Sequence, residues 1–411
     1  YSINDVKEKW YQNVRRICND YTKNALEEIG IPEEEFDKYF LKLENSKVEN
    51  MDFSVEDKLF VENFIKKTKG VKSERTRKIL EIQREWTEQL KKCDEVELYI
   101  IKSTVIIAGT CTGFVSNRII RDVEFDYVIV DEAAKATFPE LAVSLNKAHK
   151  IILVGDHQQL PPVLDTEIIR NNKEKLDEEG LAQGVFERMY NMFPEDNKHR
   201  LTIQYRMHPT IGTLISHVFY NDEIQNGVEA QDRELCIEGY EGIAIEWIST
   251  SKYSTKERYE KEFDNNGKKS YQNYLERNII ERKLLELDSK LVKRTKVAVI
   301  TGYGSQKYIL QTMVKQHSFK HIEVDVDTVD AFQGSQKDII LYSTVRSSGN
   351  KYGIGFLKSE ARINVAFSRA RCLLIIVGDM KFLDNYKIRG NKFPEIIKYI
   401  TESEGCRIIE K

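Results

Sequence analysis

Short runs of β-branched apolar residues, each followed by polar residues, limit the fold of this chain more than any other feature. Three of them, TVIIAGT (104–110), YVIVDE (127–132) and KIILVGD (150–156), alternate with segments of helical spacing. Strand and helix patterns that alternate in this way indicate a parallel sheet covered by helices. A second set of runs lies at 295–301, 321–329, 338–345 and 372–379. The sequence therefore predicts an α/β protein with two parallel-sheet domains.

The segments between these runs indicate the domain boundaries. Residues 1–98 are charged and almost free of Gly and Pro, and their apolar residues recur at helical spacing, which predicts a helical hairpin or small bundle. Residues 163–200 have a polar helical pattern, and residues 250–271 end in Asn-Asn-Gly, which predicts an exposed loop with a turn. We therefore expect a helical insertion at 1–98, a first sheet domain at 99–200 and a second at 201–411.

Composition narrows the class of protein. The 411 residues include 63 basic and 66 acidic side chains, and the net charge of −3 does not by itself require a nucleic-acid partner, although a local basic groove is allowed. The six cysteines contain no C-x-x-C pair, which argues against zinc ribbons and disulfide frameworks and for a reducing compartment. No apolar stretch is long enough to span a bilayer, so we expect an intracellular protein without a membrane partner, cytoplasmic, or nuclear in a eukaryote.

Two adjacent acids, Asp131 and Glu132, end the run YVIVDE. The carboxyl ends of parallel strands open into the crevice where α/β sheets bind ligands. There, one acid can hold Mg²⁺ and the other can polarise the water that attacks a phosphate. The alternative is structural, with Asp131 as the N-cap and Glu132 in the first turn of the next helix.

Other polar clusters stand where further apolar runs begin or end. They are Asp156, Gln158 and Gln159 in KIILVGDHQQL; Gln204, Tyr205 and Arg206 in LTIQYRMHP; Thr328, Asp330, Gln333 and Gly334 in DTVDAFQGSQKD; and Arg369 and Arg371 in NVAFSRAR. In this order they resemble the motifs of superfamily 1 helicases. The resemblance is greatest to the branch that contains the nonsense-mediated-decay helicase, senataxin and their bacterial relatives. It covers roughly residues 106–379.

The resemblance implies two RecA-like domains, the first incomplete, that bind ATP with Mg²⁺. Asp131 would hold the metal and Glu132 would be the general base. Gln159 would sense the γ-phosphate, and Arg206 and Arg369 would be arginine fingers. The nucleotide contacts would come from four further residues, Gln204, Tyr205, Gly334 and Gln336. Tyr205 would stack on the adenine. Gln336 stands where relatives commonly carry a glutamate that binds the ribose.

The resemblance also implies a single-stranded nucleic-acid partner, RNA or DNA, and 5′→3′ movement. Hydroxyls of four threonines, Thr110, Thr112, Thr301 and Thr328, would contact backbone phosphates. The alternative is that these threonines end strands or cap helices. Phe332 is more simply explained as a core residue than as a base-stacking platform.

The main departure from the family is the absence of G-x-x-x-x-G-K-[ST], the loop that cradles the β- and γ-phosphates. We expect this loop before Tyr1, in a missing N-terminal part of the same lobe, so that this chain alone would be inactive. Gly302 also stands where relatives usually carry proline. Two alternatives remain: a catalytically inactive scaffold that binds nucleic acid or protein, and the motor of a larger protein with a fused or associated effector domain.

Overall fold

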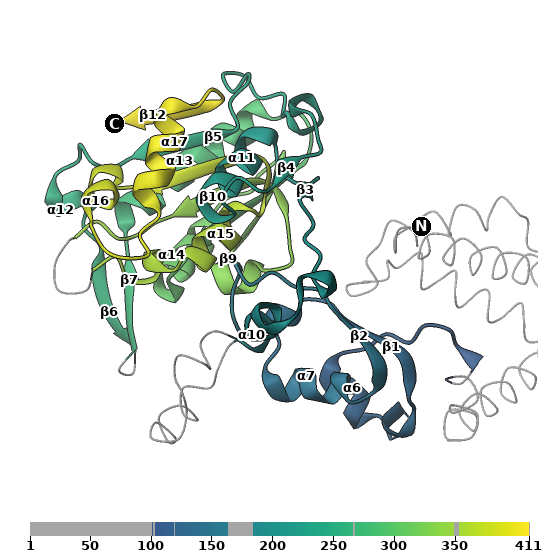
Figure 1. Ribbon diagram of the computed structural model, residues 1–411. Helices are drawn as coiled ribbons and strands as arrows, with labels where there is room; N and C mark the ends of the chain where they lie inside the picture. The colour runs from purple at the N-terminus through teal and green to yellow at the C-terminus, as the bar shows by residue number, and fades with distance from the viewer. Residues whose placement is uncertain are drawn as a thin grey trace, which may run out of the picture. The chain divides into compact units, whose positions relative to one another are not determined.

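The computed structural model describes residues 101, 103–118, 120–162, 184–265, 268–348 and 353–410. The chain separates into two compact units, residues 1–108 and 109–411. The predicted helical insertion at 1–98 lies outside the described residues, as does most of the predicted helix at 163–200. The fold below is that of the second unit (Figure 1).

A small parallel pair of strands forms the first part of this unit. β1 (Phe125–Val130) and β2 (Ala148–Leu153) lie side by side and confirm the strands predicted in YVIVDE and KIILVGD. The helical elements around them are α6 (Cys111–Ser116), η2 (Ile120–Asp122), η3 (Ala133–Lys135), α7 (Phe138–Leu145) and α10 (Val185–Met192), followed by η4 (Glu195–Asn197). Their core contains Val130, Leu141 and Phe186.

The other face of this strand pair is largely uncovered. Tyr127 and Ile129 of β1 and their neighbour Ile152 of β2 lie on this face and are exposed among the described residues. Since a parallel sheet is normally covered on both faces, these side chains form an apolar surface that more structure could cover.

The predicted strand TVIIAGT does not form. Residues 104–110 have no regular structure, and Val105 and Ile106 are exposed. A β-branched run becomes a strand only where a neighbouring strand satisfies its backbone groups. No strand pairs with this segment among the described residues.

A six-stranded parallel sheet forms the second domain. Its strands are β5 (Ile245–Ser249), β8 (Thr295–Thr301), β9 (Ile322–Thr328), β10 (Lys337–Ser343), β11 (Ala370–Gly378) and β12 (Cys406–Glu410), in the order β12-β5-β11-β10-β8-β9. All five pairings are parallel. The predicted α/β class is therefore confirmed, and the sheet is RecA-like. β8, β9, β10 and β11 match the predicted strands, whereas β5 and β12 were not predicted.

Helices cover both faces of this sheet. The helices are α11 (Pro209–Phe219), α13 (Tyr274–Lys290), α14 (Gly304–Lys315), α15 (Glu360–Phe367), α16 (Met380–Asn385) and α17 (Phe393–Glu402). Ile340 and Tyr342 of β10 pack with α11, α15 and α17, whereas Ile339 and Leu341 pack with α13 and α14. Side chains alternate between faces along a strand, so a fully apolar run is needed to fill both cores.

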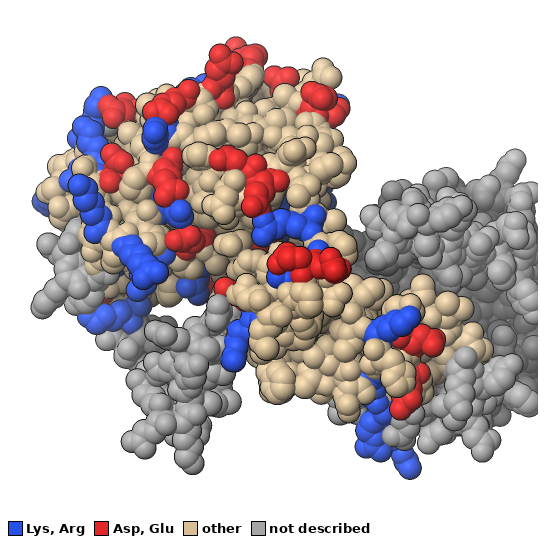
Figure 2. Space-filling view, in the orientation of Figure 1, with Lys and Arg blue, Asp and Glu red and all other residues tan. Residues whose placement is uncertain are grey.

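Short elements connect the sheet to its surroundings. They are β3 (Ile203–Gln204), β4 (Gln225–Asn226), η5 (Ala230–Arg233), η6 (Val329–Phe332) and η7 (Gly355–Lys358). On the face seen in Figure 2, acidic and basic side chains are interspersed over the second domain. This agrees with the small net charge. In the described part of the chain, no helix is both long and apolar enough to cross a membrane.

The predicted loop at 250–271 is wrong in its detail. It contains α12 (Thr255–Arg258) and an antiparallel hairpin of β6 (Lys261–Asn265) and β7 (Lys268–Gln272). The chain reverses direction between β6 and β7, where the turn was expected. These two strands were missed because they are mostly polar and lack the apolar alternation that usually reveals a strand.

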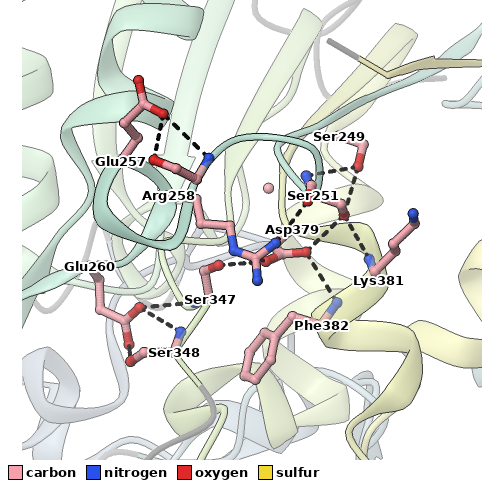
Figure 3. A network of polar contacts seen from close by, with 12 residues as sticks. Ser249, Ser251, Glu257, Arg258, Glu260, Ser347, Ser348, Asp379, Lys381 and Phe382 are labelled. Carbon is pink, nitrogen blue, oxygen red and sulfur yellow. Dashed lines mark hydrogen bonds and ion pairs between the residues drawn. The ribbon is translucent and has the colours of Figure 1, made fainter.

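A network of buried charges fixes the start of this hairpin to the carboxyl ends of the sheet (Figure 3). The Asp379 carboxylate is buried and accepts hydrogen bonds from Ser251 Oγ at 2.8 Å, Ser347 Oγ at 2.6 Å and Phe382 N at 3.1 Å. It also lies 3.3 Å from Arg258 Nε. Every oxygen of this carboxylate is therefore satisfied by the protein.

A second buried ion pair extends the network. Glu260 Oε1 lies 3.0 Å from Arg346 Nε, and both side chains are almost fully buried. The same carboxylate accepts from the backbone N–H groups of Ser347 and Ser348, each at 2.9 Å. The Arg346 guanidinium lies 4.1 Å from the ring centroid of Tyr271 in β7. We call Arg258, Glu260, Arg346 and Asp379 the closed cluster.

Candidate functional site

The two predicted acids lie at the carboxyl end of β1. Asp131 Oδ1 accepts a hydrogen bond from Glu132 N at 3.0 Å, and both residues are exposed. Glu132 has a left-handed backbone, with φ 55° and ψ 34°, and its side chain does not cap η3. The helix-cap alternative therefore does not describe this pair.

The left-handed turn at Glu132 is held from both sides. Ala133 N donates to Val154 O at 2.8 Å, and Val154 N donates to Val130 O at 2.9 Å. A non-glycine residue in this region costs roughly 1–3 kcal/mol and often marks a functional position. The strand therefore ends at a fixed turn, with the Glu132 side chain exposed.

Asp156 and Gln159 form the loop that follows β2. Asp156 Oδ1 accepts from Gln158 N at 3.0 Å, and Asp156 Oδ2 accepts from Gln159 Nε2 at 2.8 Å. The Gln159 amide is thereby oriented so that its Oε1 is available as an acceptor.

Arg369 donates a hydrogen bond to the Gln159 Oε1 acceptor. It lies between α15 and β11, is 2% exposed, and donates from Nη2 to Gln159 Oε1 at 3.1 Å. Its Nε donates to Val365 O at 3.1 Å and its Nη1 to Ser335 O at 3.4 Å. The guanidinium is thus buried among neutral acceptors. Arg369 is therefore not a salt-bridged arginine of the surface.

Arg206 lies close to Arg369. Its Nη1 donates to Ser368 O at 3.3 Å. Burial lowers the pKa of Arg206, and the charge of Glu132 opposes this effect. Burial and the charge of Arg206 lower the pKa of Arg369 to about 10, against the opposing charge of Glu132. The two guanidiniums and Glu132 are therefore close enough to influence one another.

Neither arginine forms an ion pair with a carboxylate of the described residues, in contrast to Arg362 and Arg371 nearby. A buried and a partly buried cation without paired anions are unfavourable unless a ligand brings negative charge. We call Arg206 and Arg369, with Glu132 and Gln159 beside them, the open cluster. Its chemistry suits a ligand with several anionic oxygens, such as a chain of phosphates.

Tyr220 and Asn364 also belong to this site and were not predicted. Tyr220 OH donates to Asp156 Oδ2 at 2.5 Å and accepts from Asn364 Nδ2 at 2.8 Å. Asn364 Nδ2 also donates to Gln158 O at 3.0 Å. Burial and the neighbouring Asp156 raise the pKa of Tyr220, so the phenol remains a neutral donor. Asn364 stands in NVAFSRAR, but no sequence spacing indicates these distant partners.

Gln204 shapes the loop that carries Tyr205 and Arg206. Its Oε1 accepts from Arg206 N at 2.9 Å and Met207 N at 2.8 Å, and its Nε2 donates to Met207 O at 3.0 Å and Asn226 Oδ1 at 2.7 Å. The amide has therefore used its bonding capacity. This does not fit the predicted contact of Gln204 with a nucleotide, and the residue acts by holding its neighbours.

The other predicted nucleotide contacts are accessible. The Tyr205 ring is exposed, and its backbone is held by Arg233 Nη2, which donates to Tyr205 O at 2.7 Å. Gly334 has a φ of 82°, and Gln336 is exposed immediately before β10. The ring also packs on Gly227, and its exposed remainder suits stacking on a flat ligand.

The four threonines occupy different environments. Thr110 is the N-cap of α6 and accepts from Gly113 N at 3.0 Å, as the capping alternative states, and Thr112 is exposed in α6. Thr328 ends β9 and is partly buried. Thr301 ends β8 and is fully buried, so its hydroxyl cannot reach a phosphate at the surface. Phe332 is buried, which confirms it as a core residue.

A nucleotide with its cation fits the open cluster. The described residues contain no group of three or more His, Cys, Asp or Glu side chains that could hold a metal alone. Asp131 offers one exposed carboxylate, so a cation here would take its other ligands from phosphate oxygens and water. This is the usual way in which proteins hold Mg²⁺.

Comparisons with known proteins agree with this chemistry. Two family models, both described as AAA domain, match residues 4–167 and 181–381. A regulator of nonsense transcripts 1 homolog of Neurospora crassa is 35% identical over 301 residues, which is 72% of this chain and 26% of the relative. The ATP-dependent helicase NAM7 of Saccharomyces cerevisiae is 33% identical over 324 residues, which is 78% of this chain and 31% of the relative.

An archaeal relative is covered more fully. An uncharacterized ATP-dependent helicase of Methanocaldococcus jannaschii is 29% identical over 358 residues, which is 83% of this chain and 48% of the relative. The matched part spans only about a quarter of the length of the fungal regulator.

Proposed function

Because this chain belongs to the superfamily 1 helicases of the nonsense-mediated-decay type, we propose that it is the motor part of an ATP-dependent helicase or translocase on single-stranded nucleic acid. The observation that carries this proposal is the open cluster, in which Arg206 and Arg369 are unpaired cations beside Glu132 and Gln159. Phosphoryl transfer depends mainly on such positioned positive charge.

The open cluster and four further residues, Asp131, Tyr205, Gly334 and Gln336, take distinct roles in this proposal. Asp131 holds Mg²⁺, which neutralises phosphate charge when ATP is bound. Glu132 orients and deprotonates the attacking water from its fixed turn. Arg206 and Arg369 stabilise the charge of the transferred phosphate. Tyr205 stacks on the adenine, with Gly334 and Gln336 near the ribose and phosphates.

Hydrolysis would depend on the approach of two parts of the chain. Glu132 and Gln159 follow β1 and β2, whereas Arg369 precedes β11 of the second sheet. Gln159 and Tyr220 join these parts through Arg369 and Asp156. A movement that separates the parts would withdraw the arginines, so hydrolysis and movement would be coupled.

We propose that a segment outside these 411 residues supplies the phosphate loop. No G-x-x-x-x-G-K-[ST] occurs in the sequence. The uncovered side chains of Tyr127, Ile129 and Ile152 offer a face on which further strands or helices of the same lobe could pack. Burial of such a face would stabilise the completed lobe.

The nucleic-acid strand would be held through its backbone. Two hydroxyls, those of Thr112 and Thr328, are available for phosphate contacts, and that of Thr110 would be available if it released its helix cap. The resemblance to the family supports 5′→3′ movement. Hydroxyl contacts to phosphates do not separate RNA from DNA. The polymer that stimulates hydrolysis would identify the track.

The test is nucleic-acid-stimulated ATP hydrolysis by the chain extended at its N-terminus to include the phosphate loop. Wild type and Glu132→Gln are compared with poly-U RNA and with single-stranded DNA. We expect turnover in wild type and its loss in Glu132→Gln, with ATP binding retained. A wild-type protein that binds strands but never hydrolyses ATP would favour the inactive scaffold. Equal turnover in both proteins would remove Glu132 as the base.

A further inference from the structure

One exposed aromatic ring, Phe356, stands beside two strand ends of the second sheet. It belongs to η7, where Ile354 before it and Leu357 after it are buried while Phe356 is 43% exposed. A side chain on Gly302, the residue that follows β8, would have its Cβ 3.4 Å from the Phe356 Cβ. The ring therefore lies at the carboxyl end of β8.

The position of Phe356 is fixed by its neighbours. Gly353 and Gly355 have φ values of 58° and 57°, which side chains other than glycine rarely adopt. Gly355 also packs so tightly on the Tyr303 hydroxyl that a Cβ would collide with it. The Tyr303 and Phe356 rings are 5.2 Å apart. The phenylalanine is thus supported from behind by the core.

One cation lies over the ring. The Arg362 guanidinium lies 4.7 Å from the Phe356 ring centroid, and its Nη2 is 3.2 Å from Asp330 Oδ1. Asp330 follows β9, so Arg362 connects the ring to the second strand end. Lys358 is exposed two residues after Phe356. Exposed aromatic rings next to basic side chains are the combination that binds single-stranded nucleic acid by stacking.

We propose that Phe356 is a stacking platform for one base of the bound strand, with Lys358 near the adjacent phosphate. This inference rests on the proposed function and adds a base contact to the backbone contacts of the threonines. Phe332 cannot serve in this way because it is buried. Since every base has a flat face, the contact requires a base but does not select its identity.

The experiment measures binding of this chain to two fluorescent strands of about 15 nucleotides, one with all its bases and one with abasic positions in its centre. The variants are Phe356→Ala and Phe356→Trp. Phe263→Ala, in β6, is the control because its ring is 38% exposed but lies in the hairpin. Circular dichroism confirms that each variant is folded.

We expect Phe356→Ala to weaken binding of the complete strand about 5- to 100-fold, the loss of one stacked base, and to leave abasic binding unchanged. Phe356→Trp and Phe263→Ala should bind like wild type. The stacking role is overturned if Phe356→Ala binds the complete strand as tightly as wild type does. It is also overturned if Phe356→Ala loses the same affinity for the abasic strand as for the complete strand. If wild type binds neither strand, the proposed function fails together with it.

Discussion

The open and closed clusters each contain two buried or half-buried arginines, and they differ in what faces the positive charge. In the closed cluster, Arg258 and Arg346 are paired with the carboxylates of Asp379 and Glu260. In the open cluster, Arg369 contacts backbone carbonyls, a hydroxyl and one amide. The first arrangement balances its own charge, whereas the second leaves charge available to a ligand.

This difference follows from the cost of burying ions. A buried ion pair gains little net stability over apolar packing, but removal of one partner leaves an unpaired charge and costs about 3–5 kcal/mol. An unpaired buried arginine already bears part of that cost, as the lowered pKa of Arg369 indicates. We therefore expect the closed cluster to control folding and the open cluster to control activity.

The largest expected effect is on hydrolysis. Arg369→Ala in the chain extended by its phosphate loop should lower the rate of ATP hydrolysis by about 10³ to 10⁵, because a finger that stabilises transition-state charge is lost. Nucleotide affinity should fall only modestly.

A matched control is available two residues away. Arg371 is partly exposed and pairs with Asp338 at 2.9 Å, so Arg371→Ala should hydrolyse ATP almost like wild type. Similar rates for Arg369→Ala and wild type would show that the open cluster does not act on the phosphate.

The next effect is on stability. Asp379→Ala should lower the free energy of unfolding of this chain by about 3–5 kcal/mol, since it leaves Arg258 and the hydroxyls of Ser251 and Ser347 without their acceptor. Urea denaturation followed by circular dichroism measures the change. Glu395→Gln, which removes the more exposed partner of Lys392, is the control and should cost less than about 1 kcal/mol. If Asp379→Ala were no more costly than this control, the closed cluster would have no structural role.

The last effect is a change of stability with pH, and it concerns Glu276, which lies near the closed cluster. Burial raises its pKa to about 8, although Ser343 Oγ, Thr344 Oγ1 and Val345 N donate hydrogen bonds to it. The unfolded chain releases this proton near pH 4.5, whereas the folded chain keeps it until about pH 8. Stability should therefore fall as the pH rises between these values, by at most about 1.4 kcal/mol per pH unit, and level off above pH 8.

Glu276→Gln removes this titration while keeping the shape of the side chain. Its free energy of unfolding should decrease less than that of wild type between pH 6 and pH 7. Parallel pH profiles for the two proteins would mean that Glu276 is ionised in the folded state.

The sequence predicted β8, β9, β10 and β11. Three of them, β8, β10 and β11, are apolar runs largely buried on both faces, whereas exposed acidic residues alternate with more buried ones along the edge strand β9. The predicted strand at 104–110 does not form, although this segment is also rich in β-branched apolar residues, because no strand lies beside it among the described residues. The sequence prediction also missed β12, whose run at the end of the chain is short and pairs with the distant β5. Composition indicates that a strand can form, and pairing decides whether it does.

The candidate site divides in the same way. The motifs of the sequence identified Asp131, Glu132, Gln159, Arg206 and Arg369, because the residue types and their order are local properties of the chain. They assigned Thr301 to a phosphate, but its position at the end of a central strand buries it. Gln204 was similarly assigned to the nucleotide, although its amide is used by the loop that it stabilises.

The sequence by itself therefore determined the α/β class, four strands of the second sheet and the chemical groups of the site. Only the tertiary structure brought Tyr220 to Asp156, Asn364 to Tyr220 and Arg369 to Gln159, across 64, 144 and 210 positions of the chain. The physical reason is that local patterns depend on neighbouring residues, whereas the pairing or exposure of a buried charge depends on which distant elements pack around it.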